Sequence, residues 1–148
     1  MKNKTIIFSA VLLICAYLFS ASACAFEITP LRASDYITRH DAYVSSSGRG
    51  VVKINFDINA RGTMEEVGAT TIYFYEKDGS TTRRVATYSY TNAMYQSSMM
   101  GYNTSFKKSS VTYNGTAGLQ YYAIVCLKAE NAAGSDTRSK TTTTITAT

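Results

Sequence analysis

The chain contains one histidine, His40, and the residue after it is an acid, Asp41. A catalytic base and the carboxylate that orients it must lie on the same side of the backbone. Both residues fall in a segment that we expect to be a strand, where neighbouring side chains point to opposite faces. The sequence also lacks a Gly-x-Ser-x-Gly nucleophile elbow. We therefore expect no serine hydrolase site, and we interpret His40 as an exposed polar residue.

Three glutamates, Glu65, Glu66 and Glu76, could supply the two carboxylates that glycoside hydrolysis needs. Nothing in the sequence fixes the separation between them, and adjacent glutamates are usually solvated. Oxygen ligands for calcium are present in Asp57-x-Asn59 and in Asp78-Gly79. Neither segment resembles a dense acidic calcium loop. The sequence therefore predicts a protein that is not an enzyme and that holds no metal or cofactor.

The aromatic residues are more informative, because the chain has 12 tyrosines and no tryptophan. Tyr73 and Tyr75 share one face of a predicted strand, and Tyr88 and Tyr90 share one face of its hairpin partner. The first pair is opposite in phase to the apolar residues that we place in the core, Ile72 and Phe74. The four tyrosines could form an exposed platform for sugars or for a partner protein. They could equally be cross-strand pairs that only stabilise the hairpin.

A second candidate surface is the segment from Met94 to Tyr102, which we expect to be a loop. It contains Met99 and Met100 next to its tyrosines. Methionines and tyrosines on a loop can form an adaptable contact surface. They can also close one end of a hydrophobic core. The sequence leaves these two interpretations open.

These candidates must be positioned by strands, and the central strand is expected within the apolar run Gly118–Thr137. Alternation predicts that one set of side chains faces the core. That set is Tyr121, Ala123, Val125, Leu127 and Ala129. The opposite set is apolar at first and charged later, and consists of Tyr122, Ile124, Cys126, Lys128 and Glu130. We therefore expect a central strand whose outer face is partly covered, followed by a hairpin turn at Gly134.

The remaining strands are expected at roughly ten-residue spacing, which is typical of a β-sandwich. They are predicted at residues 36–46, 51–60, 70–76, 81–91, 105–113 and 137–146. The strand 51–60 alternates cleanly between apolar and polar residues. Residues 61–69 are expected to connect two sheets, with one helical turn at Met64–Val67, and Phe106 is expected in the core. This gives about seven strands in a single all-β domain.

The last two predicted strands resemble those of fibronectin type III and related immunoglobulin-like domains. The resemblance rests on Gly118-x-x-Tyr121 and on Ala129-x-Asn131-x-x-Gly134. It implies an immunoglobulin-like antiparallel β-sandwich. It also implies that Tyr121 is a tyrosine corner, whose hydroxyl bonds back to the chain entering its strand. The chain lacks the tryptophan and the inter-sheet cysteine pair that are usual in these domains. The resemblance therefore implies their architecture and not membership of their family.

The whole chain also resembles a group of uncharacterised small secreted proteins of Gram-positive bacteria. The shared segments are an Arg-Ala-Ser-Asp-Tyr-like start, at Arg32–Tyr36, and a Met-Met-Gly-Tyr-Asn-like segment, at Met99–Asn103. This resemblance implies secretion and no particular activity.

The first residues have the pattern of a secretory signal peptide. A short basic region precedes the apolar stretch Thr5–Phe19, and small residues follow. The apolar stretch is shorter than the ~20 residues that a membrane-spanning helix needs. We expect cleavage after Ala25, which leaves residues 26–148 as one domain. Cleavage after Ala23 would instead leave Cys24 first, where a lipid anchor could be attached.

The cysteine count and the net charge bear on two further classes, disulfide-bonded proteins and nucleic-acid-binding proteins. Once residues 1–25 are removed, Cys126 is the only cysteine left, so no intramolecular disulfide can form. The formal net charge falls from +5 to about +3 because Lys2 and Lys4 are lost. The remaining basic residues are scattered, which argues against a nucleic-acid partner. Weak attraction to anionic polymers of a cell wall remains possible.

Together these features predict a secreted, extracellular, non-catalytic β-sandwich that acts by binding. The expected partner is a protein or a glycan at the cell envelope or at a host surface. Two alternatives stay open, a carbohydrate-binding module and a small exported antibacterial toxin. A hydrolase is the least favoured class.

Overall fold

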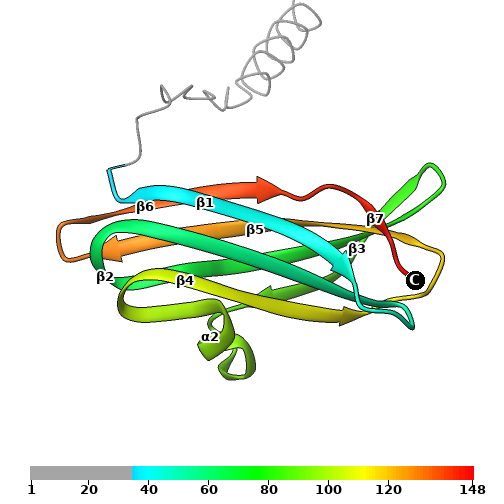
Figure 1. The fold of residues 1–148 in the computed structure, drawn as a ribbon, viewed down its shortest axis with the longest axis horizontal. Coiled ribbons are helices and arrows are strands. Elements are labelled where there is room, and N and C mark those ends of the chain that lie inside the picture. The colour runs from blue at the N-terminus through cyan, green and yellow to red at the C-terminus, as the bar shows by residue number, and fades with distance from the viewer. Residues whose placement is uncertain (1–34) are drawn as a thin grey trace, which may run out of the picture. The chain divides into compact units, whose positions relative to one another are not determined.

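A computed structural model of the protein describes residues 35–148, shown in Figure 1. The predicted signal peptide, its cleavage site and Cys24 lie outside the described residues. The described part is mostly β and contains one antiparallel sheet of seven strands. Its elements are β1 (Ile37–Ser46), β2 (Val51–Asp78), β3 (Thr81–Ser89), α2 (Ala93–Met99), β4 (Met100–Asn114), β5 (Gln120–Asn131), β6 (Gly134–Thr141) and β7 (Ile145–Thr146). None of the helices within residues 35–148 has the length and apolar character needed to cross a membrane.

Strand β2 organises the sheet because it is 28 residues long and pairs with four other strands. Its first half pairs with β1 on one side and with β4 on the other. Its second half pairs with β5 and with β3. The pairing register shifts near the middle, between Asn59 and Met64 and again between Ala69 and Thr71. Irregularities of this kind bend and twist a strand. They lie where β2 passes from pairing with β1 and β4 to pairing with β5 and β3.

The expected connection at residues 61–69, with its helical turn, is therefore wrong. The chain continues there as a strand that pairs with β4 and then with β5. Met64, Val67 and Ala69 are buried in this segment. In the strand these side chains are buried in the core and the backbone groups are hydrogen-bonded to neighbouring strands. A helical turn would therefore add neither burial nor backbone hydrogen bonds.

Side chains from both halves of β2 and from β5 meet in one hydrophobic core. The five β5 residues predicted to face inward are all fully buried, which confirms that prediction. Val52, Ile54, Phe56 and Ile58 of β2 are buried as predicted, and Ala60 is partly buried against them. Burying each large aliphatic or aromatic side chain contributes about 1.5–3 kcal/mol. Residues 35–148 contain one cysteine, so this core holds no disulfide within it.

The predicted loop after residue 92 is instead a helix, α2, followed directly by β4 (Figure 1). The side chain of Asn92 caps the helix by accepting a hydrogen bond from the Met94 backbone N–H, at 3.0 Å. The helix ends over Gly68 of β2. A Cβ atom at Gly68 would lie 2.9 Å from the Met100 Cα atom, so only glycine permits this approach.

The prediction that Phe106 lies in the core is also wrong, because its side chain is 59% exposed. The register of β4 explains the difference. Val111 pairs with Ile54 and points inward, whereas Phe106 pairs with Asn59 on the outer face. The bulge between Asn59 and Met64 lies beyond this pair, so it cannot turn Phe106 inward.

Candidate functional site

The outer face of β2 and β5 carries a group of partly exposed apolar side chains. Tyr75 pairs with Tyr122, and Tyr73 pairs with Ile124. Residues directly opposite each other on paired strands share a face. The residues that alternate with them along both strands are buried in the core. We call the outer group of Tyr73, Tyr75, Tyr122 and Ile124 the tyrosine face.

The rings of Tyr75 and Tyr122 are stacked, with their centroids 4.9 Å apart and their planes 7° from parallel. Neighbouring strands in a sheet are separated by about 4.8 Å. The ring separation therefore matches the strand separation, so the two rings stand side by side on the sheet. This arrangement directs ring edges and hydroxyl groups outward, while each ring covers one flat side of the other.

The tyrosine face has a cationic and polar border. The guanidinium of Arg84, on β3, lies 5.5 Å from the centre of the Tyr73 ring. On the other side, β6 places Thr141 next to Ile124 and Ser139 next to Cys126. An apolar centre with a polar border is the usual arrangement of a protein-binding surface.

The predicted cluster of four tyrosines does not form. Tyr88 pairs with Ile72 and so lies on the core side of the sheet, where its ring packs edge-on against Phe74, 5.5 Å away. Its hydroxyl donates to the Thr112 carbonyl at 3.1 Å. Burial raises the pKa of Tyr88. Tyr90 lies beyond the end of β3, and the Lys128 ammonium is 5.5 Å from its ring centre.

One extra residue on β3 causes this difference. Tyr75 pairs with Arg84, but Phe74 pairs with Ala86, so Val85 has no partner on β2. A one-residue bulge moves every later side chain of its strand to the other face. Without the bulge, Tyr88 would share the face of Tyr73.

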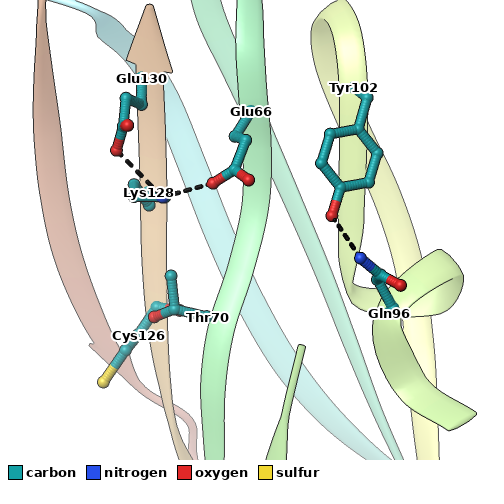
Figure 2. A network of polar contacts seen from close by, with 7 residues as sticks. All are labelled: Glu66, Thr70, Gln96, Tyr102, Cys126, Lys128 and Glu130. Carbon is teal, nitrogen blue, oxygen red and sulfur yellow. Dashed lines mark hydrogen bonds and ion pairs between the residues drawn. The ribbon is translucent and has the colours of Figure 1, made fainter. Parts of the chain in front are cut away.

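In the predicted second surface, Met94–Tyr102, Met94 and Tyr102 are exposed. Met99 and Met100 are buried, which agrees with the alternative that this segment closes part of the core and removes these two residues from a contact surface. Tyr102 pairs with Glu66 of β2. Its hydroxyl accepts a hydrogen bond from Gln96 of α2 at 2.9 Å, as Figure 2 shows.

A charged cluster lies further along the same strands from the tyrosine face. Glu66 and Glu130 are directly opposite each other in the ladder, and Lys128 lies between them (Figure 2). The Lys128 ammonium donates to Glu66 and, at 3.0 Å, to Glu130. Its side chain is 15% exposed. Burial disfavours the charged ammonium, but the two carboxylates outweigh burial and raise the pKa of Lys128.

Replacing Lys128 with methionine is expected to lower the free energy of unfolding by about 2 kcal/mol, between the values typical of exposed and buried ion pairs. The loss arises because two carboxylates would face each other with no cation between them. Chemical denaturation measures it. The matched control is Lys140→Met, which removes an exposed ion pair with Asp41 and should cost less than about 1 kcal/mol.

The Lys128 contribution also has a defined pH dependence. The pKa of this group in the folded protein is raised above its ordinary value of 10.5. The stabilisation is therefore fully present at neutral pH and is lost only as pH rises through the folded-state value. A Lys128→Met variant no less stable than Lys140→Met would contradict this account.

The residues considered for catalysis are not brought together. His40 is half-buried on the core-facing side of β1, where it pairs with Ile58, so the expectation that it is exposed is wrong. Asp41 pairs with Asp57 on the opposite face. Glu76 is buried on the inner face, whereas Glu66 lies on the outer face. The described part of the chain contains no group of three or more residues able to hold a metal ion.

The thiol of Cys126, the one cysteine of residues 35–148, lies half-buried next to Thr71 in the ladder. Burial raises its pKa. The thiol is therefore protonated at neutral pH, and a protonated thiol is a poor nucleophile. Cys126 thus extends the apolar part of the outer face.

Tyr121 has the hydrogen bond expected of a tyrosine corner. Its hydroxyl accepts from the Thr116 backbone N–H at 2.8 Å, five residues earlier in the chain. The same hydroxyl donates to Glu76 at 2.7 Å. The other carboxylate oxygen of Glu76 accepts from Arg83, at 2.8 Å from Nε and 2.7 Å from Nη2. The hydrogen bonds from Tyr121 and Arg83 outweigh burial and lower the pKa of Glu76.

Some residues of the tyrosine face were not foreseen. Alternation along β5 places Tyr122 and Ile124 on the outer face, but the sequence does not show that β5 pairs with the strand of Tyr73 and Tyr75. Arg84 has no distinguishing sequence signal. No protein-family model and no curated protein matches this chain.

Proposed function

We propose that the protein is a secreted, non-catalytic binding domain whose tyrosine face contacts a protein partner at the cell envelope or in the medium. Export is supported by the basic, apolar and small-residue pattern of the first 25 residues. We further propose an immunoglobulin-like β-sandwich architecture. It is supported by the shared core between the two halves of β2 and by the hydroxyl contact of Tyr121.

The observation that carries the proposal is the stacked pair of Tyr75 and Tyr122 on the outer face of the sheet. Tyrosine, tryptophan and arginine dominate the binding energy of protein interfaces. Here two stacked tyrosines, a third tyrosine and Arg84 lie together on adjacent strands. A regular sheet holds these side chains in place, so little entropy is lost when a partner binds.

The ring geometry favours a protein over a sugar at this face. A sugar stacks on the flat side of an aromatic ring, but in this pair each tyrosine covers one flat side of the other. The outward groups are ring edges and hydroxyls, which suit apolar contacts combined with hydrogen bonds to a polypeptide. The lack of tryptophan also argues against a carbohydrate platform here.

Replacing both Tyr75 and Tyr122 with serine is expected to weaken binding to a protein retained by the wild-type domain at least 30-fold, or about 2 kcal/mol. The measurement is surface plasmon resonance with a partner isolated from envelope fractions. The matched control is Tyr43→Ser, which changes a tyrosine of β1 that is 50% exposed and far from the pair in the ladder. Equal affinity of the double variant and the control, with both folded, would remove this face from consideration.

A further inference from the structure

A second site lies on the outer face of β1, β4 and the first half of β2. It is a pocket of about 220 Å³. Arg39 of β1, Asp57 of β2 and Phe106 and Lys108 of β4 are among the residues that line it. None of these belongs to the tyrosine face, which lies on the second half of β2 and on β5. The pocket is therefore a candidate binding site separate from the tyrosine face.

Among the charged residues that line the pocket, basic residues outnumber acids. Arg39, Lys107 and Lys108 line the pocket with Asp57 as the single acid. The Lys107 ammonium donates to the Ser97 carbonyl at 2.7 Å. Lys108 is directly opposite Asp57 in the ladder and is exposed. Lys107 is opposite the core residue Ile58, so its ammonium lies on the other face of the sheet. Arg39 and Lys108 exceed Asp57 by one positive charge, which favours a ligand that carries an anionic group.

Asp57 adds a requirement for a hydrogen-bond donor. Its Oδ1 atom is covered and has no hydrogen-bond partner among the described residues. The nearest cationic atom, Arg39 Nε, is 3.9 Å away, which is too long for a hydrogen bond. A hydroxyl placed between the two could accept from Arg39 and donate to Asp57. The Arg39 side chain is 71% exposed and can turn to admit it.

Phe106 supplies the apolar part of the site. Its ring is the most exposed aromatic side chain among the described residues and lines the pocket. Unlike Tyr75 and Tyr122, it is not stacked against another aromatic ring of the described chain. A flat ring with a free side can pack against the C–H face of a sugar. Asn59, which also lines the pocket, offers an amide for further hydrogen bonds.

We propose that this pocket binds an acidic sugar, with its carboxylate at Arg39 and Lys108, a hydroxyl at Asp57 and its C–H face on Phe106. Each group of such a ligand then meets a complementary group of the pocket. A simple carboxylate would leave Asp57 and Phe106 unused, and a neutral sugar would leave the cations unused. The domain would then bind two ligands, a protein at the tyrosine face and an acidic sugar in this pocket.

The test is a titration of the ¹⁵N-labelled protein, residues 26–148, with glucuronate, acetate and glucose, followed by nuclear magnetic resonance. We expect glucuronate to give saturable shifts of the amides of residues 57–59 and 106–108. We expect acetate and glucose to bind at least ten-fold more weakly. Absence of saturable shifts with glucuronate would overturn the proposal, and so would equal affinity for acetate or for glucose.

Three substitutions locate the site. Arg39→Gln, Lys108→Gln and Phe106→Ala change exposed side chains and are each expected to weaken glucuronate binding about ten-fold. Lys77→Gln removes an exposed cation outside the pocket and should leave binding unchanged. Tyr75→Ser with Tyr122→Ser should also bind glucuronate like the wild type, so this proposal and that for the tyrosine face can fail separately. Glucuronate binding unaffected by all three pocket substitutions would place the sugar elsewhere.

Discussion

Replacing Glu76 with alanine is expected to lower the free energy of unfolding by about 3 kcal/mol. Glu76 is 5% exposed and accepts hydrogen bonds from Tyr121 and from Arg83. Alanine would leave the buried Tyr121 hydroxyl without an acceptor and would open a cavity beside it. Urea denaturation at neutral pH measures the loss. Glu65→Ala, an exposed glutamate of the same strand, is the control and should change stability by less than about 0.5 kcal/mol.

The charge of Glu76 gives this network a pH signature. The pKa of Glu76 in the folded protein lies below its ordinary value of 4.5. Its contribution is therefore complete above pH 4.5 and is lost as pH falls through the folded-state value. A Glu76→Gln variant keeps the shape but should lack this component of acid destabilisation. Identical acid profiles for Glu76→Gln and the wild type would contradict the network.

Replacing Gly68 with alanine is expected to cost about 3 kcal/mol, because the backbone at the end of α2 occupies the space of the new Cβ atom. That atom would lie 2.9 Å from Met100 Cα and 3.1 Å from the Met99 carbonyl carbon. Backbone atoms cannot move aside as flexible side chains do. The fold would have to lift α2 away from β2 and expose the buried Met99. Thermal unfolding followed by circular dichroism measures the loss.

Gly62→Ala is the matched control, since Gly62 lies in the same strand and a Cβ atom added there would meet no other heavy atom within 4 Å. Its φ angle is +87°, so alanine there carries backbone strain of about 1 kcal/mol. The expected order of stability is therefore wild type, Gly62→Ala and then Gly68→Ala. The reverse order of the two variants would show that the backbone at the end of α2 does not lie in close contact with Gly68.

Strands with a clear two-residue period were predictable from the sequence. The alternation in β5 correctly separated Leu127 and its neighbours from Lys128 and its neighbours. This succeeded because an apolar side chain turned outward costs free energy at every second position. The turn at Gly79 was predictable for a different reason, since a positive φ angle there, +56°, suits glycine.

Irregular pairing was not predictable. The bulge at Val85, which turns Tyr88 toward the core, leaves no mark in the local composition. The continuity of β2 through residues 61–69 depends on pairing with β4 and β5, which are distant in sequence. Phe106 was placed wrongly because its hydrophobicity suggested burial, whereas its position opposite Asn59 decides its face.

In the candidate sites, too, the residues of one regular strand were predictable, whereas their neighbours on other strands were not. Tyr73 and Tyr75 could be assigned to an outer face from their phase relative to Phe74. Their neighbours Tyr122 and Ile124 come from a strand much later in the chain, and only the pairing of β2 with β5 brings them together. The pocket proposed to bind an acidic sugar likewise combines three strands, so no single stretch of sequence contains it.

The most direct test of the central proposal is photo-crosslinking at the tyrosine face. A photoreactive phenylalanine analogue replaces Tyr122 in one variant and Tyr43 in a second variant. Each variant is mixed with envelope fractions of the organism that produces the protein, and the mixture is irradiated. We expect a discrete protein adduct from position 122 and none from position 43, with the adduct lost when Tyr75→Ser is added. Equal adducts from both positions, or none from position 122, would contradict binding through the tyrosine face.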